Sequence, residues 1–159
     1  MNIFKINEVV DMGIEKEKKR RDFYGQAAEN FSENKELNEL FVKLRDWEEN
    51  HVEKFTEIRN RLAADQTFES YPGELSEYMQ ALVDDRLYQE ISPDSFKDNV
   101  QTPVDALNYG ISFEKDAILF FTELLPYIGA GNTGVINTLI DEEKKHLVYL
   151  SELKKKLSQ

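Results

Sequence analysis

Residues 44–62 read LRDWEENHVEKFTEIRNRL, and this stretch decides the fold. Its apolar side chains recur at steps of three and four residues, a spacing that predicts an α-helix with one inward stripe. Glu48 and His51 fall on that stripe. A buried carboxylate without a partner is costly or becomes neutral, so we expect a partner for Glu48 in the interior. The stripe consists of Leu37, Phe41, Leu44, Glu48, His51, Phe55, Ile58 and Leu62.

A second stretch, LIDEEKKHLVYLSELKKKL at residues 139–157, repeats the first at a constant offset of 95 residues. The chain has two histidines, His51 and His146, and each has a glutamate three residues before it. Short motifs are prone to false matches, so the agreement of the flanking residues strengthens the comparison. The matched pairs are Leu44 with Leu139, Asp46 with Asp141, Glu48 with Glu143, His51 with His146, Glu57 with Glu152, and Leu62 with Leu157.

The composition limits the class of protein. A chain of 159 residues fits one domain, residues 1–159, with a sizeable core. It has no cysteine, which excludes disulfides, thiolate zinc sites, iron–sulfur clusters and a thiol nucleophile. Charged and polar residues interrupt the N-terminal MNIFKINEVVDM, and no apolar run approaches about 18 residues. We therefore expect a soluble cytoplasmic protein whose metal ligands are oxygen and imidazole.

The formal net charge is −11. A protein that binds nucleic acid needs a basic surface to displace counterions from phosphate, so we expect no nucleic-acid partner. The basic clusters at residues 16–21 and 154–156 are short, and we interpret both as solvated helix surface. Much of the acidity is expected to be solvated as well, with four glutamates as exceptions.

A first helix is predicted over residues 7–31, and its inward stripe contains Glu17. This residue lies seven positions before Tyr24, which is two helical turns away on the same face. The alternative is a surface Glu17 that pairs with Arg20 or Arg21.

A second helix is predicted over residues 35–64, so that residues 7–64 form a helical hairpin. Glu17 lies 14 residues before the end of the first helix, and Glu48 lies 14 residues after the break at residues 32–34. With a rise of about 1.5 Å per residue, each carboxylate is about 21 Å from the turn. The two side chains should therefore lie at the same height in an antiparallel pair.

Residues 65–102 are the least regular part of the chain and contain Pro72 and Pro93. We expect a short amphipathic helix at residues 74–88 and another turn of helix near Phe96. A connection of this length can run back along a bundle as a crossover to the next hairpin.

The second hairpin is predicted over residues 103–157, with helices at about 103–125 and 132–157 that are separated by Pro126. Pro103 suits the first position of a helix. The helix that it begins repeats the first helix of the chain at an offset of 97 residues. The matched pairs are Val10 with Leu107, Gly13 with Gly110, Ile14 with Ile111, Glu17 with Glu114, Phe23 with Phe120, and Tyr24 with Phe121.

Six inward residues at the middle of the bundle make a dinuclear metal site the simplest explanation of the buried charge. Two divalent cations balance four glutamates. Imidazole with carboxylate suits iron, manganese or zinc better than calcium or magnesium. Carboxylate-bridged di-iron and di-manganese bundles have one Glu from each of two helices and a Glu-x-x-His motif from each of the other two. The predicted ligands are Glu17, Glu48, His51, Glu114, Glu143 and His146.

Four motifs carry a family resemblance: EKKRRDFY at residues 17–24, EENH at 48–51, EKDAILFF at 114–121 and EKKH at 143–146. With them the chain resembles the ferritin-like superfamily, and most closely its rubrerythrin-like branch, over essentially its whole length. This implies an all-α, ferritin-like four-helix bundle of two repeated hairpins with a long middle crossover that contains a short helix. It also implies that Glu48 and Glu143 bridge the metals, that Glu17 and Glu114 are terminal carboxylates, and that His51 and His146 bind one metal each.

Departures from the family pattern limit what carries over. Rubrerythrins have a cysteine-rich rubredoxin module for electron delivery, and this chain has no cysteine. They also have a further glutamate three residues after the third-helix ligand, where this chain has Ala117. Glu49 occupies the position of the haem-binding methionine of bacterioferritin, so we expect no haem.

Two aromatic residues lie near the predicted ligands. Tyr24 is either a hydrogen-bond donor to a ligand carboxylate or an aromatic core residue like its repeat partner Phe121. Trp47 lies beside the inward stripe and is interpreted as packing.

Three functions fit these observations, in this order. The first is a di-iron oxidoreductase that reacts with dioxygen or peroxide and receives electrons from a separate donor protein. The second is a ferroxidase or iron-handling protein, and the third is a non-catalytic, metal-stabilised sensor or adaptor. A shared bundle fold cannot choose between these chemistries. We expect two iron ions, with manganese or zinc as alternatives, a homodimer, and no membrane partner.

Overall fold

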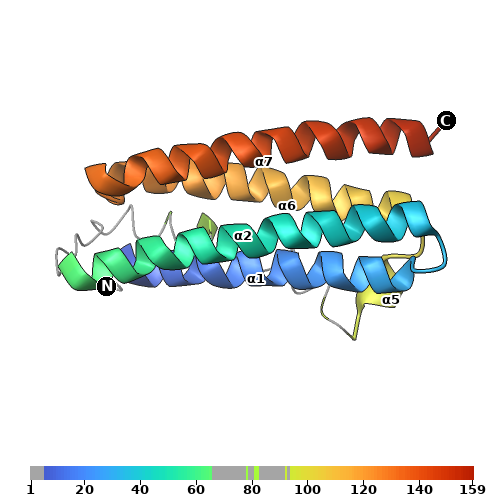
Figure 1. The fold of residues 1–159 in the computed structure, drawn as a ribbon, viewed down its shortest axis with the longest axis horizontal. Coiled ribbons are helices and arrows are strands. Elements are labelled where there is room, and N and C mark those ends of the chain that lie inside the picture. Colours follow the sequence, from blue (N-terminus) through green and yellow to red (C-terminus); the bar gives the residue numbers. More distant parts are fainter. Residues whose placement is uncertain (1–5, 66–77, 79–80, 83–91, 93) are drawn as a thin grey trace.

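The computed structural model describes residues 6–65, 78, 81–82, 92 and 94–159 (Figure 1). Every regular element that these residues form is a helix, as expected for an all-α protein. Two long pairs, α1 with α2 and α6 with α7, lie lengthwise beside each other. None of the helices in the described part is long and apolar enough to cross a membrane.

The first pair consists of α1 (Ile6–Asn30) and α2 (Lys35–Asp65), whose bounds agree with the predicted ones to within one residue. Asn34 fixes the turn between them, because its side-chain oxygen accepts a hydrogen bond at 3.2 Å from the backbone N–H three residues later. Asn38 Nδ2 donates to the carbonyl oxygen of Ala28 at 2.9 Å and ties the start of α2 to the end of α1.

The second pair consists of α6 (Pro103–Leu124) and α7 (Ala130–Leu157), joined through a turn of 3₁₀-helix, η1 (Leu125–Tyr127). The proline in η1 ends the α-helix within one residue of the predicted position, because it cannot donate the next backbone hydrogen bond. Helix α7 begins two residues earlier than predicted, directly after Gly129. The φ of +86° at Gly129 is a conformation that side chains with a Cβ rarely adopt.

Only part of the middle segment belongs to the described residues. Most of the predicted helix at residues 74–88 lies outside them, although residues 78 and 81–82 are helical. Helix α5 (Phe96–Asn99) confirms the predicted turn of helix. Its phenylalanine is buried, with its ring centroid 5.3 Å from that of Phe23, so the segment before α6 is anchored to α1.

The buried apolar side chains form two clusters, and each of the four long helices contributes to both. Between the two clusters, the same helices place buried charged side chains in the interior. This charged layer is therefore closed off by apolar packing along the helix axes. One cluster includes Val10, Phe55, Phe121 and Ile136, and the other includes Phe23, Phe41, Leu107 and Leu150.

Candidate metal centre

The charged layer contains all six predicted ligand residues. Helices α1 and α6 supply one glutamate each, and α2 and α7 supply one glutamate and one histidine each. No side chain of the six belongs to a residue that is more than 7% exposed. Carboxylates buried to this extent require a compensating charge. The residues are Glu17 on α1, Glu48 and His51 on α2, Glu114 on α6, and Glu143 and His146 on α7.

The ligand atoms of these residues form two overlapping groups of four. Within each group, one oxygen or nitrogen from every residue lies within 4.8 Å of the others. A shared carboxylate has two oxygens and can contact two neighbouring cations. Of the two groups of four, Glu48 and Glu143 belong to both, Glu17 and His51 only to the first, and Glu114 and His146 only to the second. A further group of three joins the two histidines through Glu143.

Both imidazole rings turn Nδ1 toward the carboxylates. His51 Nδ1 lies 2.5 Å from Glu143 Oε1, and His146 Nδ1 lies 3.5 Å from Glu143 Oε2. On the other side of its ring, His51 Nε2 lies 2.7 Å from Glu142 Oε2. A carboxylate on the remote nitrogen orients a metal-binding histidine and raises its basicity. The sequence did not predict this role of Glu142, because its partner lies on another helix.

Tyr24 is fully buried, and its hydroxyl donates a hydrogen bond to Glu114 Oε1 at 3.2 Å. Of the two interpretations of Tyr24, this contact supports the donor to a predicted ligand. Gly110 makes the approach possible, because a Cβ at that position would lie 2.9 Å from the Tyr24 oxygen. A side chain from α1 therefore orients a carboxylate on α6.

Arg20 is a site residue that the sequence analysis missed. The basic cluster at residues 16–21 was expected on the solvated surface, and this expectation is wrong for Arg20, which is 2% exposed. Its Nη2 forms an ion pair with Glu17 Oε1, and its Nε lies 3.6 Å from Glu48 Oε2. Glu17 is therefore both inward and paired with Arg20. The helical period was a usable signal, because Arg20 lies three residues after Glu17 and four before Tyr24.

Lys16 is the second buried cation of that cluster, also 2% exposed. Its Nζ donates to the carbonyl oxygen of Leu82 at 2.8 Å and to Asp116 Oδ2 at 3.0 Å. Asp116, on α6, also lies 3.9 Å from Arg20 Nη1. Both of these buried cations thus come from α1 and approach the same carboxylate of α6, whereas the two histidines come from α2 and α7.

Burial and mutual repulsion shift the protonation of the cluster. The pKa of Glu48 is raised well above its usual value, first by burial and then by the charges of Glu143 and Glu17. Burial lowers the pKa of His51, but the surrounding carboxylates, Glu143 foremost, outweigh it and raise this pKa to about 9. Burial raises the pKa of Glu143, and contacts with His146 and His51 lower it to about 2. A cation that binds here would displace protons from Glu48 and His51.

Many of the inward atoms make no hydrogen bond of ordinary geometry within the described residues. A buried polar atom left without a hydrogen bond costs about 1–3 kcal/mol, and native proteins contain few of them. Carboxylate oxygen with imidazole nitrogen is a donor set that suits iron, manganese and zinc. The residues present therefore fit such cations. The atoms are both carboxylate oxygens of Glu17, Glu48 and Glu143, Oε2 of Glu114, and Nδ1 of His51 and His146.

The assignment of this centre depends on its own residues. No known family model, curated protein or solved structure matches the chain. The donor set, its burial and the overlap of the two groups are therefore the observations that carry the functional argument.

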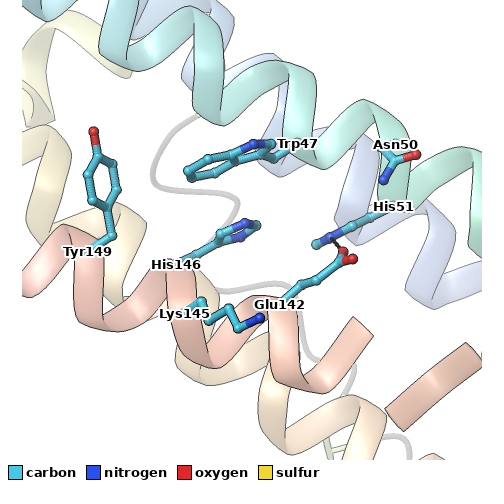
Figure 2. Close-up of a pocket in the computed structure, with 7 residues that line it drawn as sticks. All are labelled: Trp47, Asn50, His51, Glu142, Lys145, His146 and Tyr149. Carbon is cyan, nitrogen blue, oxygen red and sulfur yellow. Dashed lines mark hydrogen bonds and ion pairs between the residues drawn. The ribbon is translucent and has the colours of Figure 1, made fainter. Parts of the chain in front are cut away.

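A pocket of about 400 Å³ between α2 and α7 leads to the two histidines (Figure 2). Trp47 does pack, as predicted, and its partner is a predicted ligand: its ring stacks on His146 with centroids 4.2 Å apart. The four buried glutamates do not line the pocket, so the two histidines are the candidate ligands that a small molecule in the pocket would contact. The lining residues are Trp47, Asn50, His51, Glu142, Lys145, His146 and Tyr149.

Proposed function

We propose that this protein binds two divalent metal ions between its four long helices and uses them in a redox reaction. The observation that carries the proposal is the pair of overlapping ligand groups with two shared glutamates. Two iron ions in such a centre would supply electron exchange with dioxygen or peroxide. Glu17 and His51 would hold one ion, Glu114 and His146 would hold the other, and Glu48 and Glu143 would contact both.

The surrounding side chains would orient the ligands. Glu142 fixes the ring of His51 through the contact at 2.7 Å, and Tyr24 fixes the carboxylate of Glu114 through its hydroxyl. Metal affinity commonly falls when such supporting residues are removed. The apolar clusters on both sides exclude water from the carboxylates along the bundle.

The pocket between α2 and α7 supports a reaction with a small molecule. Its volume of about 400 Å³ is ample for dioxygen or peroxide, and it reaches the rings of His51 and His146. Electrons would come from a separate donor protein, because the chain has no cysteine for an iron–sulfur or rubredoxin-type relay. We therefore propose an oxidoreductase of the oxidase or peroxidase type.

We also propose that the chain is a rubrerythrin-like member of the ferritin-like superfamily, with residues 65–102 as its crossover, and that it forms a homodimer. Two observations support the superfamily. The two Glu-x-x-His motifs lie on α2 and α7, and the two single glutamates lie on α1 and α6, as expected for two repeated hairpins. The repeat at offsets of 95 and 97 residues gives the same pairing.

The first test is the metal content of protein purified without chelator, followed by anaerobic loading with ferrous iron and exposure to dioxygen or peroxide. We expect about two irons per chain, as in bundles with this ligand pattern. Near-ultraviolet absorption of ferric iron should then appear rapidly, and an added electron donor should allow repeated cycles.

Variants connect the result to the residues. Glu48→Ala and His51→Ala should each lower the metal content, whereas Glu53→Ala should not, because Glu53 is an exposed glutamate on the same helix. Full metal content in the first two variants would overturn the assignment of the centre. Two inert zinc ions would favour the structural role, and oxidised iron that leaves the centre and accumulates would favour iron handling.

A further inference from the structure

The two halves of the proposed centre have different neighbours. At the repeat offset of 97 residues, Glu17 corresponds to Glu114, and the residues three positions later are Arg20 and Ala117. Both of these positions are buried, with exposures of 2% for Arg20 and 1% for Ala117. One half therefore has a built-in cation where the other half has a methyl group.

Arg20 is held against Glu17, which belongs to one half of the centre, and lies near Glu48, which both halves share. Its Nη2 forms the ion pair with Glu17 Oε1, and its Nε is 3.6 Å from Glu48 Oε2. Opposite charges attract strongly where water is excluded, so the guanidinium neutralises Glu17 in the metal-free protein. A cation that approaches Glu17 must repel or displace this group.

Glu114 has a neutral partner in the other half. The Tyr24 hydroxyl donates to Glu114 Oε1 at 3.2 Å, and a phenol leaves the charge of the carboxylate intact. The residue that corresponds to Tyr24 in the second hairpin is Phe121, which has no donor to offer Glu17. Glu114 is thus oriented for a cation and keeps its full attraction for it.

We infer that the two halves fill in a fixed order, an inference that rests on the proposed dinuclear centre. The half with Glu114 and His146 takes the first ion. The half with Glu17 and His51 takes the second ion only when Arg20 releases Glu17. Arg20 is a positioning residue that gives the two ion sites unequal affinities.

Asp116 is the acceptor to which Arg20 moves. Its Oδ2 lies 3.9 Å from Arg20 Nη1, and its side chain is 24% exposed. Lys16 already contacts the same carboxylate at 3.0 Å, so both cations would share it. Solvent reaches Asp116 and screens the surplus positive charge there, whereas beside Glu17 this charge would remain buried next to the ions.

The test is a titration of the metal-free full chain with Mn²⁺ under nitrogen, with free Mn²⁺ counted by its electron paramagnetic resonance signal. Wild-type protein should bind two ions in two separate steps. His146→Ala should lose the tighter step and His51→Ala the weaker one. This pair of variants assigns each step to one half of the centre.

Three variants then test the role of Arg20. Arg20→Gln should raise the affinity of the weaker step by on the order of tenfold, because it removes one positive charge beside the second ion. Asp116→Asn should lower that affinity, and Arg20→Lys should stay near wild type. Arg21→Gln is the matched control: it removes the next arginine of α1, which pairs with Glu49 and Asp22 and should leave both steps unchanged.

Failure of this inference is distinguishable from failure of the proposed function. Wild-type protein that binds no Mn²⁺, Fe²⁺ or Zn²⁺ would overturn the dinuclear centre itself. Three results would overturn the filling order and leave the dinuclear centre standing. They are two ions bound with equal affinity, loss of the tighter step in His51→Ala, and an unchanged weaker step in folded Arg20→Gln. Helical circular dichroism identifies variants that fail to fold, and Asp116→Asn then remains as the independent test.

Discussion

At the scale of single residues, the hydroxyl of Tyr24 is buried against the carboxylate of Glu114 at 3.2 Å. Tyr24→Phe should lower the free energy of unfolding by about 1–3 kcal/mol, because it leaves a buried carboxylate short of a donor. It should also lower metal affinity by about ten- to a hundredfold. Chemical unfolding and metal titration measure the two effects.

The control for this substitution is Tyr149→Phe. Tyr149 is partly exposed at the pocket, so loss of its hydroxyl should change the free energy of unfolding by no more than about 0.5 kcal/mol. Equal effects of the two substitutions would show that the Tyr24 hydroxyl does not support Glu114.

His51 makes both stability and metal binding depend on pH. Burial lowers its pKa, but Glu143, Glu17 and Glu142 together raise it to about 9 in the folded, metal-free protein, from 6.5 in the unfolded chain. The stabilisation by protonated His51 is therefore complete below pH 6.5 and is lost as the pH rises through about 9.

Metal binding should show the opposite dependence on pH. A metal ion needs the neutral imidazole, so the affinity should rise between pH 6.5 and about 9, with release of a proton. Titrations at three pH values in this range measure it. Glu142→Gln should reduce the pH dependence, because it removes one of the carboxylates that raise the pKa of His51. Metal affinity that stays constant from pH 6.5 to 9 would contradict this account.

At the scale of the elements, helix α6 begins with a complete capping box. The Thr102 side chain accepts a hydrogen bond from the Asp105 N–H at 3.2 Å, and Asp105 Oδ2 accepts one from the Thr102 N–H at 3.0 Å. Thr102→Ala should lower the free energy of unfolding by about 1 kcal/mol, and Thr102→Ser should retain most of it. Thermal or denaturant unfolding distinguishes them; a stable Thr102→Ala protein would show that packing alone fixes the start of α6.

Two glycines of α1 should respond in opposite directions to the same substitution. A Cβ at Gly13 would lie 2.6 Å from Phe120 and would also clash with Phe55, so Gly13→Ala should destabilise the protein by about 1–3 kcal/mol. At Gly25 the nearest such atom is Arg45 Cδ at 3.6 Å. Gly25→Ala should therefore stabilise by up to about 1 kcal/mol through helix propensity. Denaturant unfolding of both variants measures the change. A destabilised Gly25→Ala protein would contradict the conclusion that a Cβ fits beside Arg45.

The long helices could be predicted from the sequence because two signals coincided at their ends. The spacing of apolar residues predicted which face of each helix points inward, and Pro103 and Pro126 marked where α6 starts and stops. The same spacing predicted the inward positions of the six candidate ligands, because residues at steps of three and four lie on the same face of a helix as the apolar residues of the core.

The residues that contact the candidate ligands were harder to predict. Arg20 and Lys16 lie in a run of basic residues, and a run of this kind is usually solvated, so their burial depends on which helix packs over them. Glu142 contacts a histidine on another helix, and no spacing along one helix encodes that contact. The spacing of the residues does not select the metal either, because one donor set accepts several ions.

At the scale of the whole molecule, metal should act as a stabilising ligand. A cation that binds only the folded state adds about 2.7 kcal/mol at a free concentration one hundred times its dissociation constant. Removal of metal should therefore lower the melting temperature, and reloading should restore it. Calorimetric melting with and without metal measures the change. A melting temperature that is the same in both states would contradict metal binding by the folded bundle.

Glu48 should stabilise the loaded protein and destabilise the metal-free one. Burial and neighbouring carboxylates raise the pKa of Glu48 above that of a glutamate in the unfolded chain. The folded state therefore opposes ionisation of Glu48, and it loses stability as the pH rises above the ordinary pKa of a glutamate. Glu48→Gln should melt at a higher temperature than wild type when both are metal-free, and should gain less from added metal. The exposed Glu53→Gln should do neither. A metal-free Glu48→Gln protein that melts earlier than wild type would contradict this.

The helix backbones approach each other most closely within the pairs α1–α2 and α6–α7, and the charged layer lies where the two pairs face each other. Without cations, the metal ligation that would join the two pairs is missing from this seam, so the pairs should separate there before either pair unravels. Such opening exposes apolar surface to proteases, and small losses of stability shorten the lifetime of a protein in the cell. The amount of this protein in a cell should then rise and fall with the supply of the proposed metal, because proteases would degrade the metal-free form faster.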